Sequence, residues 1–125
     1  MKAGIIGCGF IGSEIADFLD RDEGFKLIGL SDIDRGRAEG LIKKLKNSKP
    51  RFMKIGELIE KSDLIVESAA KSAVKEILSN KNLDKKNRKL LIMSAGGLIN
   101  NLDLLKNIKN CEILLPSGAI AGLDA

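Results

Sequence analysis

Three glycines near the amino terminus carry the pattern with the clearest chemical meaning. Gly7, Gly9 and Gly12 form G-x-G-x-x-G directly after the apolar run 2–6. In this pattern the first glycine permits a tight turn, the second leaves room for a phosphate at the backbone, and the third allows close helix packing. The free N–H groups at the start of the following helix favour negative charge. The spacing predicts a dinucleotide phosphate site; the alternative is a tight turn without a ligand.

An acidic residue stands where this motif requires one. Asp32 follows Gly12 by 20 positions, at the end of a second apolar run. A carboxylate at this place accepts hydrogen bonds from the ribose hydroxyls of NAD. Asp32 and Asp34 would repel a 2′-phosphate, whereas Arg35 and Arg37 either offset that repulsion or simply begin an exposed helix. We expect NAD to be preferred and NADP to be tolerated.

Apolar runs alternate with helical patterns along the whole chain, which is treated as one domain, 1–125. We expect strands at 2–6, 26–30, 52–54, 64–67, 89–94 and 112–115, and helices at 10–23, 38–46, 56–61, 72–79 and 102–108. Nearly unbroken apolar strands between helices indicate a parallel sheet covered on both faces. Right-handed crossovers then leave little choice of topology. The predicted fold is α/β, a doubly wound parallel sheet of the Rossmann type.

Two details of the first predicted helix follow from its sequence. Ile11, Ile15, Phe18 and Leu19 recur at helical spacing and are expected on one face of this helix. Gly24 is expected to end the helix in a left-handed conformation.

Ligands of such sheets bind at the carboxyl ends of the strands. The loops expected at those ends are rich in Gly, Ala, Ser and short acids, which lets a flat cofactor lie close to the backbone. The predicted cofactor-binding residues are Gly7, Gly9, Phe10, Ile11, Gly12, Asp32, Ile33, Ala69, Ala70, Ser94, Ala95, Gly96 and Ala119. No catalytic residue and no metal ligand is predicted. Glu67 is expected to accept backbone N–H groups, and Lys71 to begin a helix.

Composition narrows the function classes. The net charge is +4, but the lysines are dispersed and the chain has no Trp or Tyr for base stacking, which argues against nucleic acid as a partner. No apolar run reaches the roughly 18 residues of a membrane helix, and no signal peptide is recognised, so a cytoplasmic location is expected. The absence of His removes imidazole acid–base chemistry and histidine metal sites. Cys8 and Cys111 are expected to be reduced packing residues.

Four segments together resemble the L-aspartate dehydrogenase family. They are 4–12, 66–75, 91–98 and 115–125, and the last, LPSGAIAGLDA, is the most specific. The resemblance covers the whole chain and implies oxidation of L-aspartate to iminoaspartate with NAD or NADP, feeding NAD biosynthesis. It also implies that Ala119 contacts the cofactor. Departures at Ala121, Gly97 and 100–101 affect expected loop geometry only.

The resemblance further implies a catalytic histidine in a second domain beyond residue 125. We therefore expect the cofactor-binding half of such an enzyme, inactive alone, with a dinucleotide as ligand and L-aspartate bound only with the second domain. The apolar segment 119–123 suggests homo-oligomers. The alternatives are a stand-alone NAD-binding module, or the first domain of an enzyme resembling homoserine dehydrogenase or dihydrodipicolinate reductase.

Overall fold

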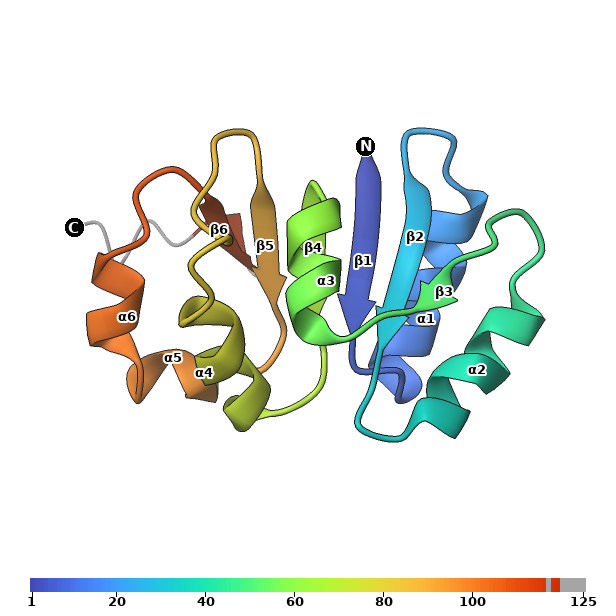
Figure 1. Ribbon diagram of the computed structural model, residues 1–125, viewed down its shortest axis with the longest axis horizontal. Coiled ribbons are helices and arrows are strands. Elements are labelled where there is room, and N and C mark those ends of the chain that lie inside the picture. Colours follow the sequence, from blue (N-terminus) through green and yellow to red (C-terminus); the bar gives the residue numbers. More distant parts are fainter. Residues whose placement is uncertain (117, 120–125) are drawn as a thin grey trace.

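The strands of the computed structural model form one sheet in the order β3-β2-β1-β4-β5-β6-β7 (Figure 1). The structure describes residues 1–116 and 118–119. The first six strands run parallel, and β7 pairs antiparallel with β6. The strands are β1 (Lys2–Ile6), β2 (Lys26–Ser31), β3 (Arg51–Phe52), β4 (Leu64–Glu67), β5 (Lys89–Ile92), β6 (Glu112–Leu115) and β7 (Gly118–Ala119). The order 3-2-1-4-5-6 is that of the dinucleotide-binding fold, so the predicted fold class is confirmed.

Helices connect the parallel strands, as the sequence predicts. They are α1 (Phe10–Arg21), α2 (Arg35–Lys44), α3 (Ile55–Lys61), α4 (Lys71–Leu78), α5 (Gly96–Ile99) and α6 (Leu102–Lys106). Lys71 begins α4, as expected. The short elements α5 and β7 were not predicted. The strand β5 ends earlier than the predicted residue 94 because the N–H of Ser94 binds the Glu67 carboxylate.

Two apolar cores lie on opposite faces of the sheet. In Figure 1, α3 crosses in front of the sheet and α1 lies behind it. The front core joins residues of α3, α4 and α5 to alternate residues of β4 and β5, such as Ile65 and Leu90, and half-buried residues of α6 pack against it. The rear core joins α1 and α2 to residues of β1, β2 and β4, such as Ile5 and Leu30.

The expectations for α1 are only partly met. Leu19 is buried and Ile15 is half-buried, but Ile11 and Phe18 are 48% and 57% exposed. The shared face is therefore only partly buried. The prediction of a left-handed end at Gly24 is wrong, because the Oδ1 atom of Asp22 accepts the Gly24 N–H and makes the turn without a left-handed residue.

Polar side chains, with Asp20 and Arg88 buried and Asp84 half-buried, hold the loops at the amino edge of the sheet. Asp20 accepts from the backbone N–H groups of residues 46–48, and Asp84 from those of residues 109–111. The buried guanidinium of Arg88 donates to the carbonyl oxygens of Glu60, Ser62, Asn82 and Leu83.

Candidate dinucleotide site

The glycine motif forms a tight turn at the carboxyl end of β1. Gly7 has φ +99°, and an added Cβ would lie 2.6 Å from the backbone nitrogen of Ala69. A Cβ on Gly12 would collide with the carbonyl oxygen of Gly7. Both positions therefore exclude any larger residue. Gly9 differs, because a Cβ there would have no atom within 4 Å, so its backbone faces open space.

Asp32 ties this turn to the neighbouring strand end. Its Oδ2 atom accepts the N–H of Cys8 at 2.8 Å, and its Oδ1 atom accepts the N–H of Asp34 at 2.8 Å. The side chain is 4% exposed, and Arg37 Nη1 lies 3.9 Å from Oδ2. Each carboxylate oxygen can accept a further hydrogen bond. The residue predicted to bind ribose thus already supports the loop.

Glu67 has the same structural role in the loop after β4. It is fully buried, and its Oε2 atom accepts the N–H of Ala69 at 2.8 Å while Oε1 accepts the N–H of Ser94 at 2.9 Å. The expectation that Glu67 accepts backbone N–H groups is confirmed. Ser68 beside it donates its hydroxyl to the Gly7 carbonyl at 2.8 Å. These contacts join the loops after β1, β4 and β5.

A pocket of about 510 Å³ opens between these loops. Six predicted residues line it: Gly7, Gly9, Asp32, Ile33, Ala69 and Ala70. Gly12 is buried against Gly7 and supports the turn from below. Phe10 and Ile11 are exposed at the start of α1, and Ser94, Ala95 and Gly96 follow β5, outside this pocket. Ala119 lies in β7, but its side chain is outside the described residues.

Sequence reasoning missed the far wall of the pocket. Phe52, Lys54, Ile55 and Glu76 line it, from the segment that joins β3 to α3 and from α4. Lys54 and Arg37 thus bring positive charge to the pocket from two different segments. Arg35 instead lies over the Phe52 ring, 4.7 Å from its centroid. Only the strand order brings residues 52–55 beside Ile33, and no local motif signals this contact.

The electrostatics of the site leave its cysteine inert. Burial, with the charge of Asp32, raises the pKa of the Cys8 thiol to about 12. Burial likewise raises the pKa of Cys111 to about 11. Both thiols are free and buried, in agreement with the predicted packing role.

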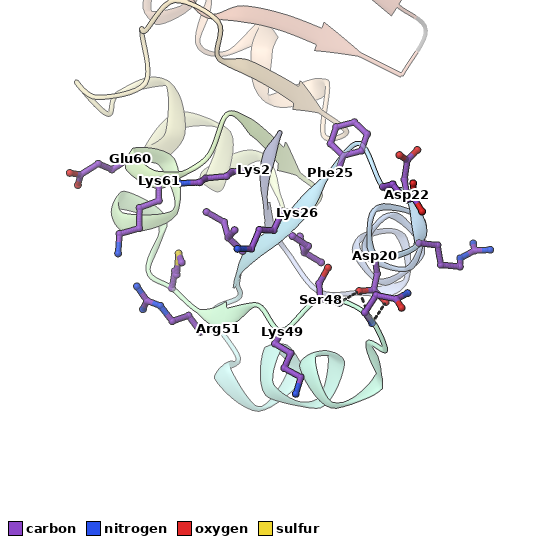
Figure 2. A pocket seen from close by; sticks show the side chains of 16 residues that line it. Lys2, Asp20, Asp22, Phe25, Lys26, Ser48, Lys49, Arg51, Glu60 and Lys61 are labelled. Carbon is purple, nitrogen blue, oxygen red and sulfur yellow. Dashed lines mark hydrogen bonds between the residues drawn. The ribbon is translucent and has the colours of Figure 1, made fainter.

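A second hollow, of about 1210 Å³, lies at the opposite edge of the sheet (Figure 2). It is lined at the amino ends of the strands by basic residues including Lys2, Lys26 and Arg51. The hydrogen bonds drawn there join the Asp20 carboxylate to neighbouring backbone N–H groups (Figure 2). No glycine turn lies among the described residues that line it, so the dinucleotide site is assigned to the pocket at the carboxyl edge.

The described part of the chain was also inspected for membrane-spanning helices and for clusters of metal-binding side chains. No helix there is long and apolar enough to cross a membrane. No group of three or more Cys, Asp or Glu side chains there is arranged to hold a metal ion.

Comparison with known families identifies the domain. The family model described as homoserine dehydrogenase, NAD binding domain, matches residues 7–113. The chain belongs to this family of NAD-binding domains. A pyridine nucleotide is therefore the ligand class of this NAD-binding domain.

Curated relatives of this NAD-binding domain are named L-aspartate dehydrogenase, whereas the family model is named after homoserine dehydrogenase. L-aspartate dehydrogenase from Methanosarcina mazei is 40% identical over 130 residues, covering 99% of this chain and 47% of the relative. The enzyme of that name from Bradyrhizobium diazoefficiens is 32% identical over 127 residues, covering 100% and 44%. The chain thus spans about half the length of the curated relatives it matches. The resemblance stated from the sequence is confirmed over that half.

Solved structures share the fold of this NAD-binding domain. A probable dehydrogenase from Thermotoga maritima gives a TM-score of 0.71 at 18% identity, over 93% of this chain and 36% of that one. Myo-inositol dehydrogenase from Lactobacillus casei, in complex with NAD(H) and myo-inositol, gives 0.68 at 17%, over 90% and 36%.

Proposed function

We propose that this chain is the cofactor-binding half of an L-aspartate dehydrogenase, with NAD preferred over NADP. The observation that carries the proposal is the open space in front of Gly9 within a turn that Gly7 and Gly12 make rigid. Homology to enzymes named L-aspartate dehydrogenase, at 40% identity for the M. mazei relative, supports the substrate.

The residues at hand fit a dinucleotide. The pyrophosphate lies over Gly9, where the first N–H groups of α1 are free of any side-chain cap and no acidic residue stands in the first turn. The adenosine lies in the pocket between Ile33 and Ala69–Ala70. Asp32 receives the ribose hydroxyls on its remaining lone pairs. Its negative charge disfavours a 2′-phosphate, while Arg37 and Lys54 make that penalty small.

The nicotinamide end is assigned to the loop after β5. Ser94, Ala95 and Gly96 begin there, and Ala119 lies on β7, which pairs with β6. When bound, the nicotinamide supplies the hydride acceptor for the Cα–H of the amino acid. The chain holds the dinucleotide, and it has no His to supply imidazole acid–base chemistry.

Calorimetric titration of residues 1–125 with NAD and then with NADP tests the cofactor assignment. We expect saturable binding of both, tighter for NAD, and no aspartate-dependent formation of NADH. Absence of binding by either nucleotide would overturn the site. Robust turnover of aspartate by residues 1–125 would overturn the proposal that these residues bind the cofactor without catalysing the reaction alone. Binding without any aspartate activity in a longer polypeptide containing this chain would favour the alternative of the first domain of an enzyme resembling homoserine dehydrogenase or dihydrodipicolinate reductase.

A further inference from the structure

Two side chains of opposite charge line the far wall of the carboxyl-edge pocket. Lys54 lies between β3 and α3, and Glu76 lies on α4. The two segments are neighbours on the front of the sheet. A Cβ on Gly56 would lie 3.8 Å from the side-chain nitrogen of Asn80, and Asn80 comes just after α4, four residues beyond Glu76. The pocket is therefore bounded on this side by an ammonium group and a carboxylate from adjoining segments.

Both groups are available to a ligand. Among the residues that the structure describes, the Lys54 ammonium and the Glu76 carboxylate form no ion pair and no hydrogen bond, either with each other or with a third group. Both residues are exposed. Asp32 and Arg37 in the same pocket differ, because their charged atoms lie only 3.9 Å apart. Lys54 and Glu76 thus offer one free donor group and one free acceptor group.

Lys54 is also an unfavourable residue for the helix that it precedes. It is the N-cap of α3, and its side chain makes no capping hydrogen bond. Ser, Thr, Asp or Asn at this place would accept a free N–H of the first turn, whereas positive charge at the start of a helix is unfavourable. The stability of α3 therefore does not explain a lysine here, which favours a role in the pocket.

The walls of the pocket suit a flat base. Ile33 is 107% exposed, more than any other large apolar side chain among the described residues. Small or apolar residues of other segments also line the pocket, namely Ala69, Ala70, Ala73 and Ile55. Apolar walls with a few polar groups are typical of small-molecule sites, in which the polar groups fix the orientation of the ligand. Lys54 and Glu76 are placed to orient a base that lies against these walls.

We propose that Glu76 and Lys54 recognise the base of the dinucleotide. The Glu76 carboxylate accepts the exocyclic N6–H2 group of adenine, and the Lys54 ammonium donates to the ring nitrogen N1. Adenine carries this donor and this acceptor side by side on one edge, so a carboxylate beside an ammonium matches it. Hypoxanthine carries the reverse pair, an O6 acceptor and an N1–H donor, and is mismatched at both places. The inference rests on the proposed cofactor site and adds which purine that site selects.

Calorimetric titration of residues 1–125 with NAD and with nicotinamide hypoxanthine dinucleotide tests the inference. The two ligands carry the same charge and differ only at this edge of the purine. We expect NAD to bind about tenfold more tightly. Glu76→Gln and Lys54→Met should each reduce the preference to about threefold or less, because a Gln amide can donate to O6 and Met donates to nothing. Glu39→Gln and Lys75→Met, both exposed and outside the pocket, are the matched controls and should keep the tenfold preference.

Equal affinity of the parent for the two dinucleotides would overturn the inference and leave the NAD site intact. A tenfold preference that persists in both pocket variants would also overturn it, since other groups would then recognise the base. Binding of neither dinucleotide would overturn the cofactor assignment itself and this inference with it. Circular dichroism checks that the variants are folded, and the comparison of the two ligands on the parent depends on no variant.

Discussion

Asp32 and Glu67 make the same pair of contacts at two different strand ends. Each carboxylate accepts one N–H from two residues further along its own loop and one N–H from the loop of the adjoining strand. The loops after β1 and β2 are joined by the first, and those after β4 and β5 by the second. The candidate site is therefore framed by two acidic side chains that bind backbone and not solvent.

Because the space at Gly9 is open, a substitution there should change cofactor affinity without changing the stability of the fold. Gly9→Ala places a methyl group where the pyrophosphate is proposed to lie, without meeting any protein atom. We expect NAD affinity to fall by at least about tenfold, or ~1.4 kcal/mol, with a change in unfolding free energy within about 0.5 kcal/mol. Calorimetry and urea unfolding measure the two quantities. Gly40→Ala, also in open space, is the control and should leave binding unchanged. Unaltered binding by Gly9→Ala would remove the phosphate from this turn.

The cofactor preference depends on Asp32. Asp32→Ala removes the acceptor for the ribose and the charge that opposes a 2′-phosphate, so we expect the affinity for NAD to fall more than that for NADP. Asp17→Ala, in an exposed pair with Arg21 on α1, is the control and should leave both affinities unchanged. Parallel titrations with both nucleotides decide the matter. Equal losses would mean that Asp32 acts only as a support for the loop.

The buried carboxylate of Glu67 should be important for stability. Glu67→Gln keeps one oxygen but turns an NH2 group toward a backbone N–H, which is left unsatisfied in the interior. We expect a loss of about 1–3 kcal/mol in the free energy of unfolding. Glu39→Gln on the exposed side of α2 should change it by less than about 0.5 kcal/mol. Similar values for the two variants in urea unfolding would show that Glu67 is not a support.

The contacts of the buried Asp20 carboxylate predict how the free energy of unfolding depends on pH. Burial raises the pKa of its carboxyl, but the N–H groups of Ser48, Asn47 and Lys46 outweigh burial, and the net pKa lies below its ordinary value of 3.8. A carboxyl with a lowered pKa in the folded state stabilises the protein above its unfolded pKa, and this contribution is lost as pH falls through the folded pKa.

Asp20→Asn should therefore be less stable than the parent at pH 7, and the difference should shrink progressively below about pH 4. Urea unfolding at a series of pH values measures it, with Asp17→Asn on the exposed side of α1 as control. A difference that stays constant down to pH 2 would contradict the role of the Asp20 charge.

Arg88 is a buried cation whose hydrogen-bond partners are all carbonyl oxygens. Arg88→Lys keeps the charge but offers three donors from a single point, which cannot reach the carbonyls of both segments, 60–62 and 82–83. We expect a loss of about 2 kcal/mol or more in the free energy of unfolding. Arg21→Lys, which retains an exposed pair with Asp17, is the control. Equal stability of the two variants would mean that the Arg88 contacts contribute nothing.

The segments of the fold with strong local signals were predictable. β1, β4 and β6 coincide with their apolar runs, and the glycine turn has the form that its spacing requires. The short helix α5 has two glycines among four residues and is stabilised by packing against α4, so propensity did not indicate it. The exposure of Phe18 was not predictable, because periodicity shows which residues share a side and not how much of that side the sheet covers.

The site was predictable to a similar degree. Six of the predicted residues line one pocket because parallel strands end at one edge, and their binding of a cofactor stays a prediction. The contribution of Lys54 and Ile55 was not, since it depends on β3 pairing beside β2. The role of Ser68, whose hydroxyl binds a carbonyl 61 positions earlier in the chain, has no local signature.

Because Asp32 and Glu67 bind peptide N–H groups, the side chains of Ala69 and Ser94 contribute nothing to that support. Those two positions can change identity while the loops keep their spacing. A protein built in this way can acquire a different ligand preference by substitutions at the rim, with its scaffold left in place. The side chains that support the loops of this domain and the side chains that would contact the ligand can therefore be substituted independently.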